Sequence, residues 1–210
     1  MAMMESMEAT RRRHIIDCTI RVIARDGLTG TSLSRVAREA KVAKGIICYY
    51  FGNKDGLFAA VMERLRERTF LSAVKRAESR DEAWERIAAF VCTHLQLMRD
   101  RQVEVLAMRH LAESDGNGQD DDQISIWREQ RDWLAETLKA GQLAGDFKQF
   151  DAHVVAGAIS GAIDSGLARL AHDPEFDLNH CSAQLLALLE PGVRGANLPD
   201  VIPDASLAAE

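Results

Sequence analysis

Residues 31–57 read TSLSRVAREAKVAKGIICYYFGNKDGL, and this stretch decides the fold that the sequence predicts. A polar pair, Thr31 and Ser32, can cap a short helix. The apolar residues of that helix recur at helical spacing: Leu33, Val36, Ala37 and Ala40. A break near Lys41 precedes a second short helix at 43–51. Two short helices around a tight turn can form a helix-turn-helix, whose second helix enters the major groove of DNA.

Each side of this unit has a predicted role. The side chains expected to pack inward are Leu33, Val36, Ala37, Val42, Ile47 and Phe51. Those expected on the outer face are Lys44, Ile46, Cys48, Tyr49 and Tyr50. On pattern alone, two short helices around a turn can equally be a corner of an ordinary core, so both readings stay open at this point.

The rest of the chain predicts more helices and no strands. A helix over about 8–26 ends at Gly27, and a longer one over 55–76 follows the short pair. Further helices are expected at 81–99, 102–113, 121–144, 151–171 and 178–190. Only 6% of the residues are aromatic and four are prolines, which suits long helices. We therefore predict an all-α protein of about nine helices: a DNA-binding domain at 9–54, a helical domain at 55–190 with 55–76 as connector, and an irregular tail at 191–210.

Charge is distributed unevenly along the chain. The net charge is -6, which by itself argues against nucleic acid as a partner. Residues 1–70, however, hold 13 lysines and arginines against 8 acidic residues, whereas residues 71–210 hold 13 against 24. Between Arg11 and Lys54 there are 10 basic and 3 acidic residues. The positive field is therefore concentrated on the predicted helix-turn-helix, where it can attract DNA phosphates.

Two motifs within 31–57 resemble the signature of the tetracycline-repressor (TetR) family. They are Thr31-Ser32-Leu33-x-x-Val36-Ala37 and the run from Val42 to Leu57. The string Gly45-Ile46-Ile47-x-Tyr49-Tyr50-Phe51, with Arg11-Arg12-Arg13, is similar to choline-responsive repressors of glycine betaine synthesis within that family. The resemblance covers about Arg11 to Met62. It implies a homodimer with an N-terminal DNA-binding domain and a divergent helical domain that binds a small effector.

The resemblance also assigns roles in DNA binding. The residues it implicates are Thr31, Ser32, Ala43, Lys44, Gly45, Ile46, Cys48, Tyr49, Tyr50 and Lys54. Ser32 and Lys54 are expected on phosphates, Tyr50 along the DNA backbone, and Ile46 near a thymine methyl group. Ala43, Lys44, Gly45 and Tyr49 are expected to face the groove, and Cys48 stands where many members have a phosphate-contacting tyrosine. Lys41 stands where the family usually has a turn glycine.

The acidic part of the chain is expected to carry the dimer interface and an effector site. Small residues recur at 157, 161 and 165, which permits close helix approach within the chain or between chains. The resemblance implies that the dimer contact lies on the last two long helices, at about 151–171 and 178–190, and the expected contacts there are Gly157, Gly161, Ser165, Leu185 and Leu189. The candidate effector-pocket residues are Trp84, Phe90, His94, Met98, Met108, His110, Trp127 and Trp133, although large side chains of this kind are mostly ordinary core.

Several classes of protein are disfavoured. The six histidines lack metal-ligand spacing, so we expect no bound metal and no cofactor. No nucleophile motif occurs, so we do not expect the protein to be an enzyme. The four cysteines lack disulfide-framework spacing, and the apolar stretch at 154–171 contains Asp164 and Arg169, so a cytoplasmic protein is expected. The leading hypothesis is a dimeric repressor released from a near-palindromic operator by a small effector. The alternatives are a ligand-independent regulator or activator and, less favoured, an all-α enzyme.

Overall fold

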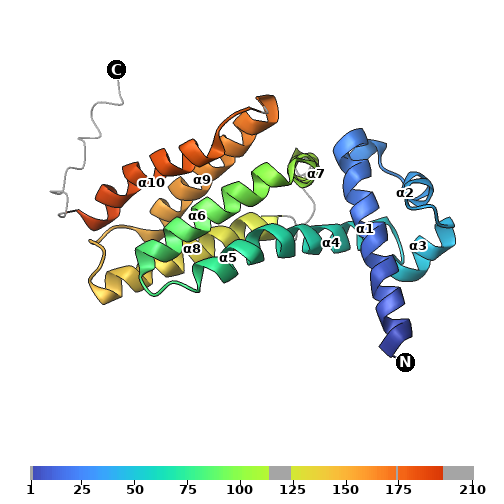
Figure 1. Cartoon of the computed structure of the whole chain (residues 1–210), viewed down its shortest axis with the longest axis horizontal. Helices are drawn as coiled ribbons and strands as arrows, with labels where there is room; N and C mark the ends of the chain where they lie inside the picture. The colour runs from blue at the N-terminus through green and yellow to red at the C-terminus, as the bar shows by residue number, and fades with distance from the viewer. Residues whose placement is uncertain (1, 114–123, 174, 196–210) are drawn as a thin grey trace, which may run out of the picture.

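In a computed structural model, the structure describes residues 2–113, 124–173 and 175–195, and every regular element within them is helical (Figure 1). The N-terminal elements are α1 (Ala2–Gly30), α2 (Leu33–Ala40) and α3 (Lys44–Phe51). The connector comprises α4 (Lys54–Arg66), η1 (Glu67–Leu71) and α5 (Ser72–Ala77). The remaining helices are α6 (Ala83–Asp100), α7 (Gln102–Glu113), α8 (Ile124–Ala144), α9 (Ala152–His172) and α10 (Leu178–Arg194). The all-α prediction is confirmed, with nine helices in the described ranges when the connector counts as one.

The first helix begins earlier than predicted. It begins at Ala2 instead of near residue 8, so the arginine run at 11–13 lies inside it. The predicted stop is present, because Gly27 has φ 68° and ψ 175°, which breaks the helical path. A positive φ of this size favours glycine, which has no Cβ to clash with the backbone. Residues 28–30 then form a short turn leading to α2.

The connector is not the single α-helix that the sequence predicts. Residues 67–71 form a π-helix between α4 and α5, and the Thr69 hydroxyl donates to the Leu65 carbonyl at 2.7 Å. A π turn widens the helix locally and changes the direction of the side chains that follow it. Periodicity read along the sequence cannot show this insertion, because the apolar spacing on either side remains helical.

Two apolar clusters hold the molecule together. The first joins α1, α2, α3 and α4 to α7 and contains Ile15, Ile23, Ile47, Leu57 and Leu111. The second lies among η1, α5, α6, α8, α9 and α10 and is built around buried side chains such as Phe70, Phe90, Leu134 and Ile159. Figure 1 shows α2 and α3 at one end of the molecule, beyond α1, and α8, α9 and α10 toward the other end. We call α1, α2 and α3 the head.

The predicted start of the tail is wrong by four residues. Helix α10 continues through Pro191 to Arg194. Proline supplies no N–H to the helix, but its carbonyl accepts a hydrogen bond from the Gly195 N–H at 3.0 Å, so the last turn closes. The remainder of the predicted tail, residues 196–210, lies outside the described residues. The predicted boundary between the two domains falls at the start of α4.

Candidate nucleic-acid interface

The turn between α2 and α3 holds the two short helices at a fixed angle. At the start of α2, before this turn, the Ser32 hydroxyl caps the helix by accepting a hydrogen bond from the Arg35 N–H at 3.3 Å. Lys41 ends α2 in the left-handed conformation, with φ 55° and ψ 42°. This conformation costs a non-glycine residue about 1 kcal/mol. The Val42 N–H donates to the Ala37 carbonyl at 3.0 Å, which closes the turn despite that cost.

The turn after α3 is fixed by a close backbone approach. A Cβ on Gly56 would lie 2.2 Å from the Phe51 carbonyl oxygen, so no larger residue fits there without movement. Asn53 caps α4 by accepting a hydrogen bond from the Gly56 N–H at 2.8 Å. Ile47 and Phe51 are buried in the head cluster. Helix α3 is therefore held at both ends and along its inner face.

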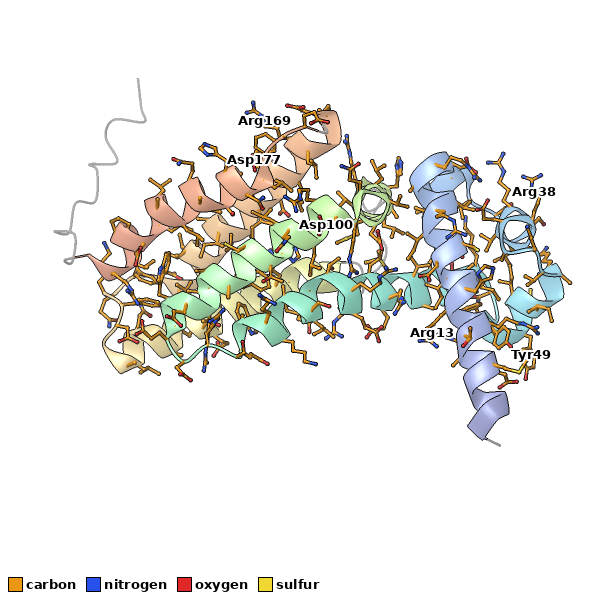
Figure 2. The ribbon with its side chains drawn as sticks, viewed as in Figure 1. Arg13, Arg38, Tyr49, Asp100, Arg169 and Asp177 are labelled. Carbon is orange, nitrogen blue, oxygen red and sulfur yellow. The ribbon has the colours of Figure 1, made fainter. Side chains whose placement is uncertain are left out.

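The outer face of α3 is open. Tyr49 is 74% exposed, and Ala43, Lys44, Gly45 and Cys48 are also exposed. A Cβ built on Gly45 would meet nothing within 4 Å, so packing within the chain does not require glycine at this position. A glycine here instead allows a ligand to approach the backbone closely. Figure 2 shows Tyr49 on the lower outer side of the head.

Two of the α3 residues that are predicted to contact DNA are only partly exposed. Ile46 and Tyr50 are half-buried and pack against the head cluster. The Tyr50 ring meets the Tyr49 ring edge to face, with centroids 5.2 Å apart. Tyr50 therefore supports the exposed Tyr49 ring, which limits the directions that Tyr49 can adopt.

The surface beside α3 carries unpaired positive charge. Within the described part of the chain, Arg38, Lys41 and Lys44 form no ion pair, and all three are exposed. The head's acids Asp26 and Glu39 instead pair with Arg21, Arg25 and Arg35 at 2.9–3.4 Å. Hydrogen bonds from Arg25 lower the pKa of both carboxyl groups, so they stay ionised and paired. The prediction missed Arg38, which the amphipathic pattern of α2 places opposite its apolar face (Figure 2).

Thr31 does not reach this surface, and its predicted DNA contact is wrong. The residue is only 3% exposed, and its hydroxyl donates to the Gly27 carbonyl at 2.7 Å. Its backbone N–H donates to the Leu28 carbonyl at 3.1 Å. Thr31 therefore stabilises the turn after α1, while its neighbour Ser32 is exposed at the start of α2.

Other basic residues border the outer face. The Lys54 ammonium lies 5.0 Å from the centre of the Phe58 ring at the start of α4, and Lys54 is half-buried. The Arg12 guanidinium lies 5.2 Å from the centre of the Phe51 ring, which brings α1 to the end of α3. Arg11, Arg12 and Arg13 are all exposed. Their contact with DNA stays a prediction.

Three of the predicted pocket residues lie close together. The Phe90 ring stacks on His94 with centroids 5.4 Å apart and lies 4.8 Å from the Trp133 ring. Trp84 is buried in the same cluster as Phe90. The Nδ1 atom of His94 is buried without a hydrogen-bond partner, and burial lowers its pKa to about 4. A neutral imidazole and an aromatic wall are therefore present between α6 and α8.

The eight predicted pocket residues do not form one site. Met98 and Met108 belong to the other apolar cluster, which packs α7 against the head, because α6 contributes to both clusters and α7 only to that one. His110 is half-buried beside Gly27, whose Cβ would lie 3.9 Å from its Nδ1 atom. The Trp127 side chain lies outside the described residues. A pocket of about 300 Å³ opens elsewhere, at the seam between α1, η1 and α7.

The predicted dimer residues divide into two groups. Gly161 and Ser165 are exposed, Gly157 is half-buried, and a Cβ built on either glycine would meet nothing within 4 Å. The two glycines therefore have no packing partner among the described residues. Leu185 and Leu189 instead turn partly inward against the second cluster. The exposed apolar side chains that the prediction missed are Val154 on α9, 68% exposed, and Leu188 on α10, 77% exposed.

Two other kinds of site do not occur in the described ranges. No three or more histidine, cysteine, aspartate and glutamate side chains come together there in a way that can hold a metal ion. No helix there is long and apolar enough to cross a membrane.

Residues 15–61 match a known sequence family, that of the bacterial regulatory proteins, tetR family. Over 104 residues the chain is 38% identical to the HTH-type transcriptional regulator BetI of Burkholderia thailandensis, covering 49% of this chain and 52% of the relative. It is 36% identical over 104 residues to BetI of Burkholderia ambifaria, with the same coverage. The chain thus spans about half the length of the curated relatives it matches.

Solved structures resemble the whole fold. FadR from Bacillus subtilis in complex with stearoyl-CoA superposes with a TM-score of 0.74 at 23% identity, covering 86% of this chain and 98% of that one. A transcriptional regulator from Saccharomonospora viridis in complex with choline gives a TM-score of 0.70 at 23% identity, covering 88% and 98%. These relatives and neighbours are transcription regulators and not enzymes, in agreement with the expectation for this chain.

Proposed function

Because this chain belongs, through residues 15–61, to the tetR family of bacterial regulatory proteins, we propose that it is a dimeric repressor that a small effector releases from its operator. One observation supports the proposal most strongly. Lys44, Gly45 and Tyr49 lie exposed on α3, a helix held rigidly at both ends. A regulator of this kind works in the cytoplasm, where it meets chromosomal DNA.

In the proposed complex, α3 lies in the major groove. Tyr49 and the backbone at Gly45 approach base edges, and Lys44 reaches a base or a phosphate. Arg38 and Lys41 contact phosphates on the flank, since no carboxylate of the described chain neutralises them. Ser32 uses its hydroxyl hydrogen toward a phosphate while its oxygen caps α2. The Cys48 thiol stands exposed between Lys44 and Tyr49 and can make only a weak hydrogen bond.

The proposed dimer joins α9 and α10 of two chains. Gly157 and Gly161 have no neighbour over them in the described part of the chain, and Ser165 is exposed, so a second copy can approach closely. Val154 and Leu188 supply exposed apolar surface on the same two helices. In a two-fold dimer each patch meets its own copy, which suits a row of small residues and apolar neighbours. Two heads can then read two half-sites about 34 to 36 Å apart.

The proposed effector lies near α6 and α8. Phe90, Trp133 and Trp84 offer aromatic faces, and His94 offers a neutral imidazole whose Nδ1 has no partner in the chain. A buried polar atom without a hydrogen bond costs about 1 to 3 kcal/mol, which a ligand group can recover. The structural neighbours bound to stearoyl-CoA and choline supply two compounds for a first trial, an acyl thioester and a quaternary ammonium.

The proposed function is tested by selecting DNA from a random pool with the full chain and measuring its affinity at two salt concentrations. We expect a near-palindromic site whose affinity falls steeply with salt, because lysines and arginines displace counterions from phosphates. Addition of choline or of stearoyl-CoA then tests release. Failure to enrich any sequence, or weak binding whose affinity does not depend on the salt concentration, contradicts the DNA-binding proposal. Tight binding that no small molecule alters instead favours a ligand-independent regulator.

Removing the exposed side chains of α3 should weaken operator binding. We expect Lys44→Ala and Tyr49→Ala each to cost about 1 to 3 kcal/mol of specific binding free energy, the usual value of a base contact. Fluorescence anisotropy with the selected operator measures this loss. Lys75→Ala, which removes an exposed lysine from α5, is the matched control and should bind like the parent. Parental affinity in both α3 variants would exclude this face as the reading surface.

A further inference from the structure

The arginines of the connector extend toward different parts of the molecule. Arg66, at the end of α4, donates from Nε to Glu129 Oε2 at 2.6 Å and from Nη2 to Glu129 Oε1 at 2.5 Å. This two-pronged geometry fixes the orientation as well as the distance of both side chains. The same hydrogen bonds lower the pKa of Glu129, so the pair stays ionised. The connector is thereby tied to α8.

Arg68 lies two residues further on and makes contacts with other elements. Its Nη1 atom lies 3.4 Å from Asp17 Oδ1 on α1 and 3.2 Å from Glu104 Oε1 on α7. Arg64 also reaches Asp17, at 3.6 Å. The Glu104 side chain is only 11% exposed, so solvent screens its pair with Arg68 weakly. The connector is thereby tied to the head and to α7.

The helical geometry explains why neighbouring arginines serve opposite partners. Residues two apart on a helix point about 200° apart, so Arg66 and Arg68 leave the connector on opposite sides. Arg68 lies within the π-helix η1, a widened turn of the kind often found at functional sites. Conversion of that turn to an ordinary α-helical turn would redirect Arg68 relative to Arg66. Such a conversion would therefore change the contacts of Arg68 with α1 and α7 relative to the contact of Arg66 with α8.

The seam where Arg68 acts is not filled by apolar side chains. The pocket of about 300 Å³ lies at this point, and its wall includes Asp17, Arg68 and Glu104. Elsewhere α1 packs on α7 through apolar residues such as Val105, Met108 and Leu111. The apolar contact holds the head to the rest of the molecule, while the open, charged side of the seam leaves room for the head to tilt.

We propose that Arg66 and Arg68 are positioning residues that set the angle of the head, with Arg66 linking the connector to α8 and Arg68 linking it to α1 and α7. The inference rests on the proposed function, because the head angle matters where two heads must match two half-sites. A displacement of α8 moves Glu129 and, through Arg66, the connector. Arg68 passes that displacement to Asp17 and so to α1. Neither arginine needs to touch DNA or the effector.

The Arg66–Glu129 pair allows a direct test by charge exchange. Arg66→Glu and Glu129→Arg are each expected to weaken operator binding about 10-fold, within the range of typical coupling between sites. The double variant, which restores opposite charges, is expected to return to within about 3-fold of the parent, as coupled residues do in a double-mutant cycle. Arg76→Glu on α5 is the control, because Arg76 is exposed and has no ion pair in the described ranges. Arg68→Gln should weaken binding similarly, and Arg68→Lys should restore part of the loss.

A second measurement follows the head without DNA. Spin labels on the exposed Cys48 of the head and Cys92 of α6, in a Cys181→Ser background diluted with unlabelled chains, report the distance between head and bundle. We expect a broader or shifted distribution of distances in each single variant and the parental distribution in the double variant.

Circular dichroism selects the variants that keep the parental helix content, and Arg66→Gln substitutes for any that do not. If the parent binds no DNA, the proposed function fails while the distances still test the positioning role. Parental distances in every single variant overturn the inference, as does a double variant that restores neither readout.

Discussion

A leucine in place of Gly161 is expected to convert the dimer to a monomer that keeps its helical fold and loses operator affinity. Nothing in the chain lies within 4 Å of a Cβ built at this position, so the side chain has room in the monomer. Leucine also favours a helix over glycine by about 0.8 kcal/mol. In the dimer, however, the side chain would meet the partner's α9. Overpacking costs about 1 to 3 kcal/mol at each site, and two-fold symmetry applies the cost twice.

Sedimentation equilibrium measures the change in mass, and circular dichroism verifies that the helices remain. The matched control is Ala140→Leu, which places the same side chain on the exposed face of α8 and should leave the dimer intact. Operator binding should fall with dimer content, because a single head contacts one half-site. A Gly161→Leu variant that keeps the mass of the parent shows that this face of α9 is not the interface.

Acid is expected to unfold the protein partly through His94. Burial lowers the pKa of its imidazole in the folded protein to about 4, whereas the unfolded chain has the ordinary value near 6.5. Above about pH 6.5 the residue is neutral in both states and imposes no penalty. As the pH falls from there toward 4, the unfolded state binds the proton first, so the free energy of unfolding decreases. The loss approaches about 3 kcal/mol once the pH reaches the folded pKa.

Urea unfolding between pH 7.5 and pH 4.5, at one protein concentration, measures this dependence. A His94→Leu variant should lose less stability with acid than the parent, because the remaining titrating groups are common to both proteins. His153→Gln, which changes an exposed histidine on α9, serves as the control and should follow the parent. The same pH dependence in His94→Leu and in the parent would mean that the buried imidazole does not titrate as its environment predicts. Binding of an effector group to Nδ1 should raise stability at neutral pH.

The head shows how much local sequence can determine. Gly27, Gly52 and the capping residues Ser32 and Asn53 fix where its helices begin and end, and local backbone chemistry depends on few neighbours. The inward face of α2 and α3 also follows from spacing, since Val36, Ala37, Ile47 and Phe51 are buried as predicted. Thr31 was misjudged because its hydroxyl turns back to Gly27, a contact that residue type alone does not show.

The larger domain shows where local sequence is insufficient. Its helices follow from apolar periodicity, but the sequence could not show which of the two apolar clusters each candidate pocket residue joins. Phe90 and Met98 lie on the same helix eight residues apart, yet they belong to different clusters. Which cluster a residue joins depends on how α7 crosses α6 and meets α1, and that is a property of the assembled fold.

The sequence by itself therefore determined most of the helices, the turn near Lys41 and the exposed outer face of α3, because caps, glycines, periodicity and charge act over a few residues. Only the tertiary structure decided what lies opposite each side chain. It left Gly157 and Gly161 without a neighbour among the described residues, gave Arg66 and Arg68 different partners, and buried His94 beside Phe90. These outcomes depend on contacts between segments that are distant in the chain, and the local spacing of residues does not predict such contacts.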